Sequence, residues 1–212
     1  MVLDSQRKKI DPVLSFIAKF FSKINPDLLT WISLLFAFIS GLFFFFSSPG
    51  RELMNYYLFF GSLFVFLNGL FDALDGKVAK MRNKDSRRGD FLDHAFDRFS
   101  DVLIVGGIAL GPWCQDWLGV VAIAGVLLTS YMGTQSQAVG FQRTYSGFLG
   151  RADRLVFLML VPIVQHILIH VNLEIIYGFY LMEWILIYFA FMGNLTAVQR
   201  FFKTMRWFKK NR

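Results

Sequence analysis

Residues 72–97 read DALDGKVAKMRNKDSRRGDFLDHAFD, a polar stretch in a chain that is otherwise largely apolar. Asp72 and Asp75 are three residues apart, and Asp93 and Asp97 are four apart, so each pair shares one face of a helix. Two helices that meet at these faces would gather four carboxylates, which repel one another in a low-dielectric setting and need cations. Oxygen ligands select hard ions such as Mg²⁺, Mn²⁺ or Ca²⁺. The pattern therefore predicts a two-metal site.

The residues around this stretch are apolar enough to cross a membrane. Of the 212 residues, 55% are hydrophobic, which exceeds the usual share in a soluble domain. Uncharged runs of 19 residues occupy positions 28–46 and 53–71, and each is long enough to span a hydrocarbon core of about 30 Å. We therefore expect an all-α integral membrane protein that forms a single domain over residues 1–212.

We expect six transmembrane helices preceded by a juxtamembrane helix. Residues 1–25 mix basic and apolar side chains at helical spacing, which is typical of an amphipathic helix lying in the membrane interface. The expected spans cover residues 28–47, 53–76, 89–111, 117–141, 155–173 and 175–199.

The distribution of basic residues predicts the orientation of these spans. With six spans, every Lys and Arg except Arg51 falls on the side that holds both termini and the carboxylates. Basic residues gather on the cytoplasmic side of membrane proteins, so we expect a multi-pass protein of the cell membrane with its site and both termini in the cytoplasm. The net charge of +7 then reflects contact with anionic lipid rather than nucleic-acid binding.

The spacing Asp72-x2-Asp75-Gly76-x2-Ala79-Lys80-x8-Gly89-x3-Asp93-x3-Asp97 resembles the signature of the CDP-alcohol phosphatidyltransferases. Seven of the eight fixed positions match, and Lys80 stands where the family usually has Arg, so charge is kept but the planar fork is lost. The resemblance implies a homodimeric enzyme with six transmembrane helices. It implies metal-dependent transfer of a lipid phosphate group from a CDP-linked lipid to the hydroxyl of a polar acceptor, with release of CMP.

The resemblance also implies roles for individual residues. Two Mg²⁺ or Mn²⁺ ions would be held by Asp72, Asp75, Asp93 and Asp97. Asp97 would also act as the general base on the acceptor hydroxyl. The expected contacts to the CDP-lipid are Asp27, Leu28, Leu29, Thr30, Gly76, Lys80 and Ser86. His94 follows Asp93 directly and would point about 100° away from it on a helix, which predicts a surface role.

Three arginines indicate the nature of the acceptor. Arg151 and Arg154 begin the fifth expected span, and Arg200 ends the sixth. Arginines that converge near carboxylates suggest an anionic acceptor bound through its phosphate. Residues 150–154 are similar to the family branch that uses inositol phosphate, and residues 131–154 look most like archaeal members that make archaetidylinositol phosphate. The donor would be CDP-archaeol or CDP-diacylglycerol, with glycerol phosphate open as acceptor and serine less favoured.

Two other functions fit an acidic cluster in a membrane protein. An aspartate-rich membrane prenyltransferase would carry two acidic clusters in separate repeats of a longer chain. A divalent cation transporter would place its carboxylates near the bilayer midplane, within inverted repeats. Here all four aspartates fall within 26 residues, at the expected cytoplasmic edge and without a visible repeat, so both alternatives are less favoured.

Overall fold

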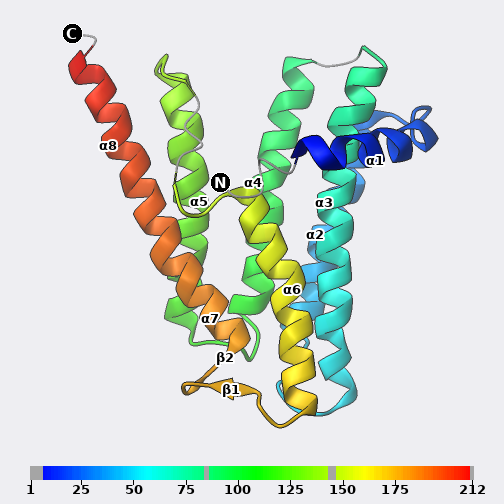
Figure 1. Ribbon diagram of the computed structural model, residues 1–212, viewed down its shortest axis with the longest axis vertical. Coiled ribbons are helices and arrows are strands. Elements are labelled where there is room, and N and C mark those ends of the chain that lie inside the picture. Colours follow the sequence, from blue (N-terminus) through cyan, green and yellow to red (C-terminus); the bar gives the residue numbers. More distant parts are fainter. Residues whose placement is uncertain (1–6, 84–85, 143–146, 211–212) are drawn as a thin grey trace.

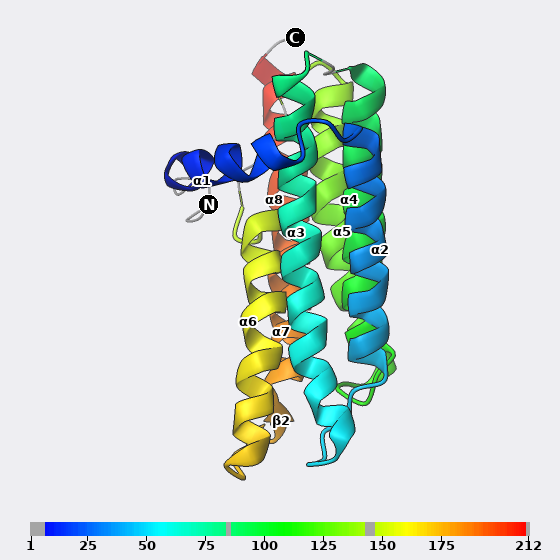
Figure 2. The same cartoon turned by 90° about the vertical axis from the view of Figure 1, so that its right-hand side faces the viewer.

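Long, roughly parallel helices form a bundle, and α1 lies crosswise to them in both views (Figures 1 and 2). The computed structural model describes residues 7–83, 86–142 and 147–210. The elements in chain order are α1 (Arg7–Phe20), α2 (Pro26–Phe45), the 3₁₀ turn η2 (Leu53–Tyr56), α3 (Tyr57–Met81), α4 (Arg87–Ala109), α5 (Asp116–Ala138), α6 (Arg151–His170), β1 (Ile175–Ile176), β2 (Phe179–Tyr180), α7 (Leu181–Tyr188), the π-helical turn η3 (Phe189–Gly193) and α8 (Asn194–Lys210).

Five helical segments in the described part of the chain are long and apolar enough to cross a membrane. They are Pro26–Phe45, Leu53–Met81, Asp116–Ala138, Arg151–His170 and Leu181–Lys210. The remaining long helix of the bundle, α4, corresponds to the third expected span, but charged residues crowd its first half and keep it outside this set. The architecture is that of a multi-pass helical membrane protein.

Most helix ends differ from the expected spans by a few residues, and capping explains the start of α4. We expected this helix to begin at Gly89, but it begins at Arg87 because Ser86 is its N-cap. The Ser86 hydroxyl accepts a hydrogen bond of 3.1 Å from the backbone N–H of Gly89, which satisfies one of the donors that a helix start leaves unpaired.

The sixth expected span, 175–199, is wrong at both ends. Residues 175–180 form a small hairpin in which Ile175 pairs with Tyr180 and Ile176 with Phe179. Its turn needs two residues with positive φ, and Tyr177 (φ 52°) and Gly178 (φ 85°) supply them. Hydropathy alone does not distinguish this apolar hairpin from the start of a helix. At the other end, the helix continues through the basic residues as far as Lys210.

Two glycines bring α2 and α4 into backbone contact. An added Cβ on Gly107 would lie 2.1 Å from the carbonyl oxygen of Gly41, closer than any real side chain can approach. Small residues at such a crossing let membrane helices approach closely and gain van der Waals contact. Further along the same helices, the Asn68 side chain of α3 donates to the backbone oxygen of Ser33 (2.9 Å) and to the Ser100 hydroxyl (3.2 Å), which ties α2, α3 and α4 together.

The last helix contacts α5 in a similar way. An added Cβ on Gly193 would lie 2.7 Å from the carbonyl carbon of Gly125, and the Thr129 hydroxyl donates to the backbone oxygen of Gly193 at 2.7 Å. Gly193 ends the π-helical turn η3, and a π-turn offers carbonyl groups outside the regular α-helical pattern. The turn therefore joins α7 to α8 while both helices stay in contact with α5.

The α2–α4 crossing yields a test of the fold. We expect Gly107→Ala to lower the free energy of unfolding by about 1–3 kcal/mol, because its methyl group would force two backbones apart. Gly106→Ala is the matched control, since a Cβ at that neighbouring position meets no heavy atom within 4 Å. Thermal unfolding in detergent would measure both, and equal stability of the two variants would contradict the close contact.

Candidate active site

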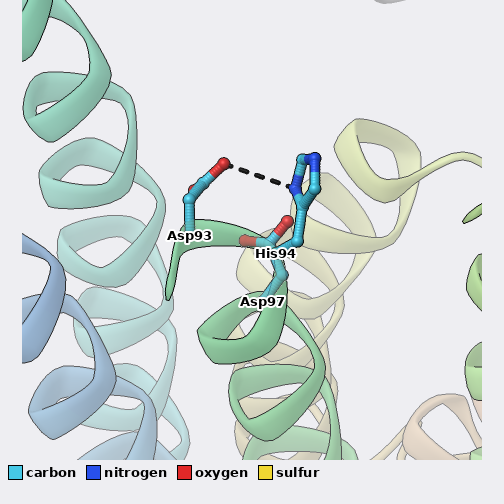
Figure 3. Close-up of side chains that lie close together, drawn as sticks. All are labelled: Asp93, His94 and Asp97. Carbon is cyan, nitrogen blue, oxygen red and sulfur yellow. Dashed lines mark ion pairs between the residues drawn. The ribbon is translucent and has the colours of Figure 1, made fainter. Parts of the chain in front are cut away.

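Four aspartates converge where α3 ends and α4 begins. One carboxylate oxygen from each of Asp72, Asp75 and Asp93 lies within 4.8 Å of the other two. Asp93 also belongs to a second group in which its carboxylate, His94 and Asp97 offer ligand atoms within the same 4.8 Å (Figure 3). The structure thus gathers the carboxylates that the residue spacing predicted to converge, with Asp93 common to both groups.

The carboxylate geometry fits a hard divalent cation. Asp75 is only 5% exposed, and its Oδ2 is buried without a hydrogen-bond donor among the described residues. A buried carboxylate oxygen without a partner costs free energy, and a cation ligated by that oxygen and by its two neighbours would remove the cost. Asp72, Asp75 and Asp93 therefore form a suitable oxygen ligand set for Mg²⁺ or Mn²⁺.

His94 lies closer to the acidic residues than the sequence indicated. Its Nδ1 lies 3.5 Å from Asp93 Oδ2, and its Nε2 lies 3.5 Å from Asp90 Oδ1. Figure 3 shows the imidazole turned toward the Asp93 side chain at the top of α4. Asp90 is four residues before His94, so helical spacing allows that contact. Adjacent residues point to different faces, so the periodicity carries no signal for the contact with Asp93, which the side-chain rotamers create.

Arg151 supplies the cation that touches the carboxylates directly. It is the first residue of α6, and its Nη1 and Nη2 donate to the two oxygens of Asp72 at 2.8 and 3.1 Å. Its Nη2 also forms an ion pair with Asp97 Oδ1. The guanidinium thereby bridges α3 and α4 with the two-pronged geometry that only arginine offers.

The ion pairs continue inward from Asp97. Arg98 Nη2 lies 3.3 Å from Asp97 Oδ2, and its Nε lies 3.5 Å from Asp101 Oδ2. Arg154 Nη2 lies 3.2 Å from the same Asp101 oxygen. Positive and negative groups therefore alternate along one chain of contacts, which we call the ion-pair chain: Asp72, Arg151, Asp97, Arg98, Asp101 and Arg154.

The other two arginines expected at the acceptor are buried and hold helices together. Arg154 is 2% exposed, and besides Asp101 it donates from Nη1 to the backbone oxygen of Val126 at 3.1 Å. Arg200 is 5% exposed, and its Nη1 donates to the backbone oxygen of Thr129 at 2.5 Å. These bonds fasten α6 and α8 to α5. Of the three, Arg151 is the one whose ion pairs reach Asp72 and Asp97.

The first turn of α2, expected to contact the CDP-lipid, lies close to the carboxylates. Asp27 forms an ion pair of 2.6 Å with Arg88 of α4, and Thr30 is buried with its hydroxyl 3.2 Å from the backbone oxygen of Pro26. Leu28 is half exposed. Leu29 is fully buried in a small apolar cluster whose other fully buried members are Ala18, Leu74 and Val78.

The remaining expected contacts lie on or beside the two acidic helices. Gly76 follows Asp75 on an exposed part of α3, and an added Cβ there would meet no heavy atom within 4 Å. Lys80 is exposed in the last turn of α3. Ser86 uses its hydroxyl as the cap of α4. Open space at Gly76 leaves room for a ligand to approach the backbone beside the metal ligands.

A cleft of about 620 Å³ opens between the first half of α4 and the second half of α5. It borders the ion-pair chain at Arg98, and its other polar lining includes Arg87, Tyr131, Thr134 and Gln137. The Asp90 carboxylate and apolar side chains such as Phe91 and Leu127 also line the cleft, so it is a mixed surface whose arginine, hydroxyl and amide groups can bind the polar part of a small molecule.

Comparison with known proteins shows the family of the chain. Residues 23–195 match the family model for CDP-alcohol phosphatidyltransferases. The chain belongs to this family. It is therefore a membrane-bound transferase of phospholipid biosynthesis, and neither the prenyltransferase nor the transporter reading finds support.

Several relatives agree with this family. The chain is similar to the archaetidylinositol phosphate synthase of Pyrococcus horikoshii, with 28% identity over 81% of this chain and 88% of the relative. It is similar to the phosphatidylinositol phosphate synthase of Cutibacterium acnes, with 29% identity over 70% and 69%. Its fold matches a crystal structure of the phosphatidylinositol phosphate synthase of Mycobacterium tuberculosis with CDP-DAG bound. That match has a TM-score of 0.70 and 22% identity, and it covers 91% of this chain and 94% of the other.

The inner end of the ion-pair chain yields a test of its structural role. We expect Asp101→Asn to destabilise the protein by about 3–5 kcal/mol, because it leaves the buried Arg154 charge without its carboxylate. Replacing both partners with apolar residues, as Asp101→Leu with Arg154→Met, should cost much less, since no buried charge is then unpaired. Thermal unfolding in detergent would compare the variants. A double variant at least as unstable as Asp101→Asn would contradict this role.

Proposed function

We propose that this enzyme transfers the lipid phosphate group of CDP-archaeol or CDP-diacylglycerol to a hydroxyl of inositol phosphate. The acceptor oxygen bonds to the lipid-linked phosphorus, the bridging P–O bond breaks, and CMP leaves with the bridging oxygen. The single observation that carries the proposal is the convergence of Asp72, Asp75 and Asp93 beside Asp97 and Arg151, where a metal-binding set, a base and an anion-binding group adjoin one another.

The donor would lie along the carboxylates between α2 and α4. Hard divalent cations, when bound by the four aspartates, would neutralise the pyrophosphate and the leaving CMP, and we propose two Mg²⁺ or Mn²⁺ ions. The exposed backbone at Gly76, the first turn of α2 and Lys80 would contact the CDP group. Structures of the M. tuberculosis enzyme contain CDP-DAG in one case and manganese with citrate in another, which supports this class of donor and cation.

Asp97 is the carboxylate we propose as general base. It is 4% exposed and lies between two cations, with Arg151 on one oxygen and Arg98 on the other. A base must come within hydrogen-bond reach of the proton that it removes. Its ion pair with Arg98, which lines the α4–α5 cleft, supports the proposal that an acceptor hydroxyl would bind beside Asp97.

Inositol phosphate is the acceptor that these groups fit best. Arg151 offers a guanidinium fork at the carboxylates, and Arg98 and Arg87 line a cleft with Tyr131 and Gln137. Guanidinium groups bind phosphate through paired hydrogen bonds, while hydroxyl and amide groups suit a polyol. Arg154 and Arg200 support this site by holding α6 and α8 against α5.

The membrane setting follows from the same arrangement. We propose that the end of the bundle with the carboxylates faces the cytoplasm, together with both termini and most basic residues. There α1 would lie in the interface, since Phe16 and Phe20 are largely exposed while Ala18 packs inward. A lipid donor would then keep its tails in the bilayer while its headgroup reaches the site. The enzyme would be a homodimer, as the resemblance to the family implies.

Release of CMP tests the proposed reaction. Purified enzyme with Mg²⁺ or Mn²⁺ and a CDP-lipid should release CMP with inositol phosphate and much less with glycerol phosphate, serine or unphosphorylated inositol. Omission of the divalent cation should abolish release, because the pyrophosphate charge is then not neutralised. Preference for an uncharged acceptor would contradict the acceptor assignment, and no CMP with any acceptor would contradict the reaction.

Asp97→Asn separates catalysis from binding. An amide cannot take the acceptor's proton, and loss of a general base lowers turnover by roughly 10²–10⁴-fold. We expect CMP release to fall to that extent while binding of the CDP-lipid, measured by equilibrium dialysis, stays substantial. Asp116→Asn is the matched control, because Asp116 is exposed at the start of α5. Turnover of the Asp97 variant equal to that of the control would exclude this base.

A further inference from the structure

We propose that Arg151 and a divalent metal ion exchange on the same carboxylate oxygens, so that metal binding releases Arg151 to bind the phosphate of the acceptor. Arg151 would then be the resident counter-cation of the acidic cluster as well as a substrate-binding residue. The exchange of Arg151 with a metal ion is argued only from contacts within this chain. The binding of the acceptor phosphate by the released Arg151 rests on the proposed function.

The contacts of Arg151 coincide with the proposed metal ligands. Both oxygens of Asp72 accept hydrogen bonds from it, at 2.8 and 3.1 Å, and one oxygen of Asp97 is ion-paired with it. By contrast, Asp75 Oδ2 is buried without a donor in the described part of the chain. The guanidinium therefore occupies part of the ligand set and leaves the rest ready for a cation.

Arg151 and a metal ion compete for these carboxylates. The fork uses one lone pair on each Asp72 oxygen and holds its positive charge where a cation bound by both oxygens would lie. Two cations held a few ångströms apart would also repel each other strongly in a partly buried site. A divalent ion carries twice the charge of the guanidinium, so it compensates more of the carboxylate charge than Arg151 does and can replace it.

Arg151 can move away without disturbing the fold. It is the first residue of α6, so its side chain lies at the very end of the helix. Movement of this side chain breaks no backbone hydrogen bond of α6. Its side chain is 26% exposed, whereas Arg154, one turn further along, is 2% exposed and bonded to α5. Arg151 Nε donates to no described group, so a released guanidinium offers donors to phosphate.

The exchange couples the two binding events. Metal binding would raise the affinity for a phosphorylated acceptor, because it frees the group that binds the phosphate. By linkage, the acceptor would raise the affinity for the metal by the same factor. An acceptor would therefore be captured best by enzyme that already holds its metal ions.

Metal titration tests the exchange without any lipid. Mn²⁺ binding, followed by electron paramagnetic resonance, should be about tenfold tighter in Arg151→Gln than in the wild-type protein, because a charge-assisted competitor is gone. Arg82→Gln is the matched control: it removes one positive charge just beyond the end of α3, where Arg82 donates to the backbone oxygens of Lys23 and Ile24. Mn²⁺ affinity in Arg151→Gln no higher than in the control would overturn the exchange.

Chemical labelling of arginines tests the exchange in the wild-type protein. This test does not depend on whether Arg151→Gln folds. Phenylglyoxal should modify Arg151 slowly without metal and several times faster with saturating Mg²⁺, as read by peptide mass spectrometry. Arg154 should stay protected in both conditions, since it is almost fully buried. Arg151 labelling that does not rise with Mg²⁺ would overturn the exchange.

The acceptor step has a separate readout. With Mg²⁺ present, inositol phosphate should protect Arg151 from phenylglyoxal again, and unphosphorylated inositol should not. Lack of protection would overturn the release of Arg151 to the acceptor while leaving metal exchange standing. Because none of these measurements needs CMP release, failure of the exchange and failure of the proposed reaction give different results.

Discussion

The ion-pair chain is the interaction on which the rest of this structure depends. Charged groups inside a bundle of membrane helices are costly unless each one is neutralised, and here every member touches a partner of opposite sign. The chain begins on α3 at Asp72, crosses α6 and α4, and ends at Arg154, which is bonded to the backbone of α5. Four helices are thus held in register by one alternating set of charges.

Burial divides this chain into two parts with different consequences. The inner pair, Asp101 and Arg154, is almost fully enclosed and connects helices. At the other end, Arg151 and Asp72 are partly exposed, and Arg151 is ion-paired with Asp72 and with the buried Asp97. One turn from these carboxylates, the hydrogen bonds of Asn68 to Ser33 and Ser100 hold α3 against α2 and α4. Buried contacts between helices therefore fix where the carboxylates lie relative to one another.

The sequence by itself determined the helical class and the convergence of the acidic residues. Spacings of three and four put each aspartate pair on one helix face, and apolar runs on both sides show that the helices cross a membrane. Both signals come from residues close together in the sequence, so they do not depend on how the helices pack. The turn at Tyr177 and Gly178 was not predicted, because hydropathy does not distinguish the apolar hairpin around it from the start of a helix. Likewise, a serine cap moved the start of α4.

Only the tertiary structure decided which charges meet. Three arginines looked equivalent in the sequence, yet Arg154 and Arg200 bond to backbone oxygens of α5 while Arg151 reaches the carboxylates of Asp72 and Asp97. The contact of His94 with Asp93 was equally hidden. Side-chain partners across helices depend on how helices cross and on how deeply each group is buried, and neither is encoded in local periodicity. That is why the sequence identified the carboxylate cluster, whereas the packing of α6 against α3 decided that Arg151 reaches it.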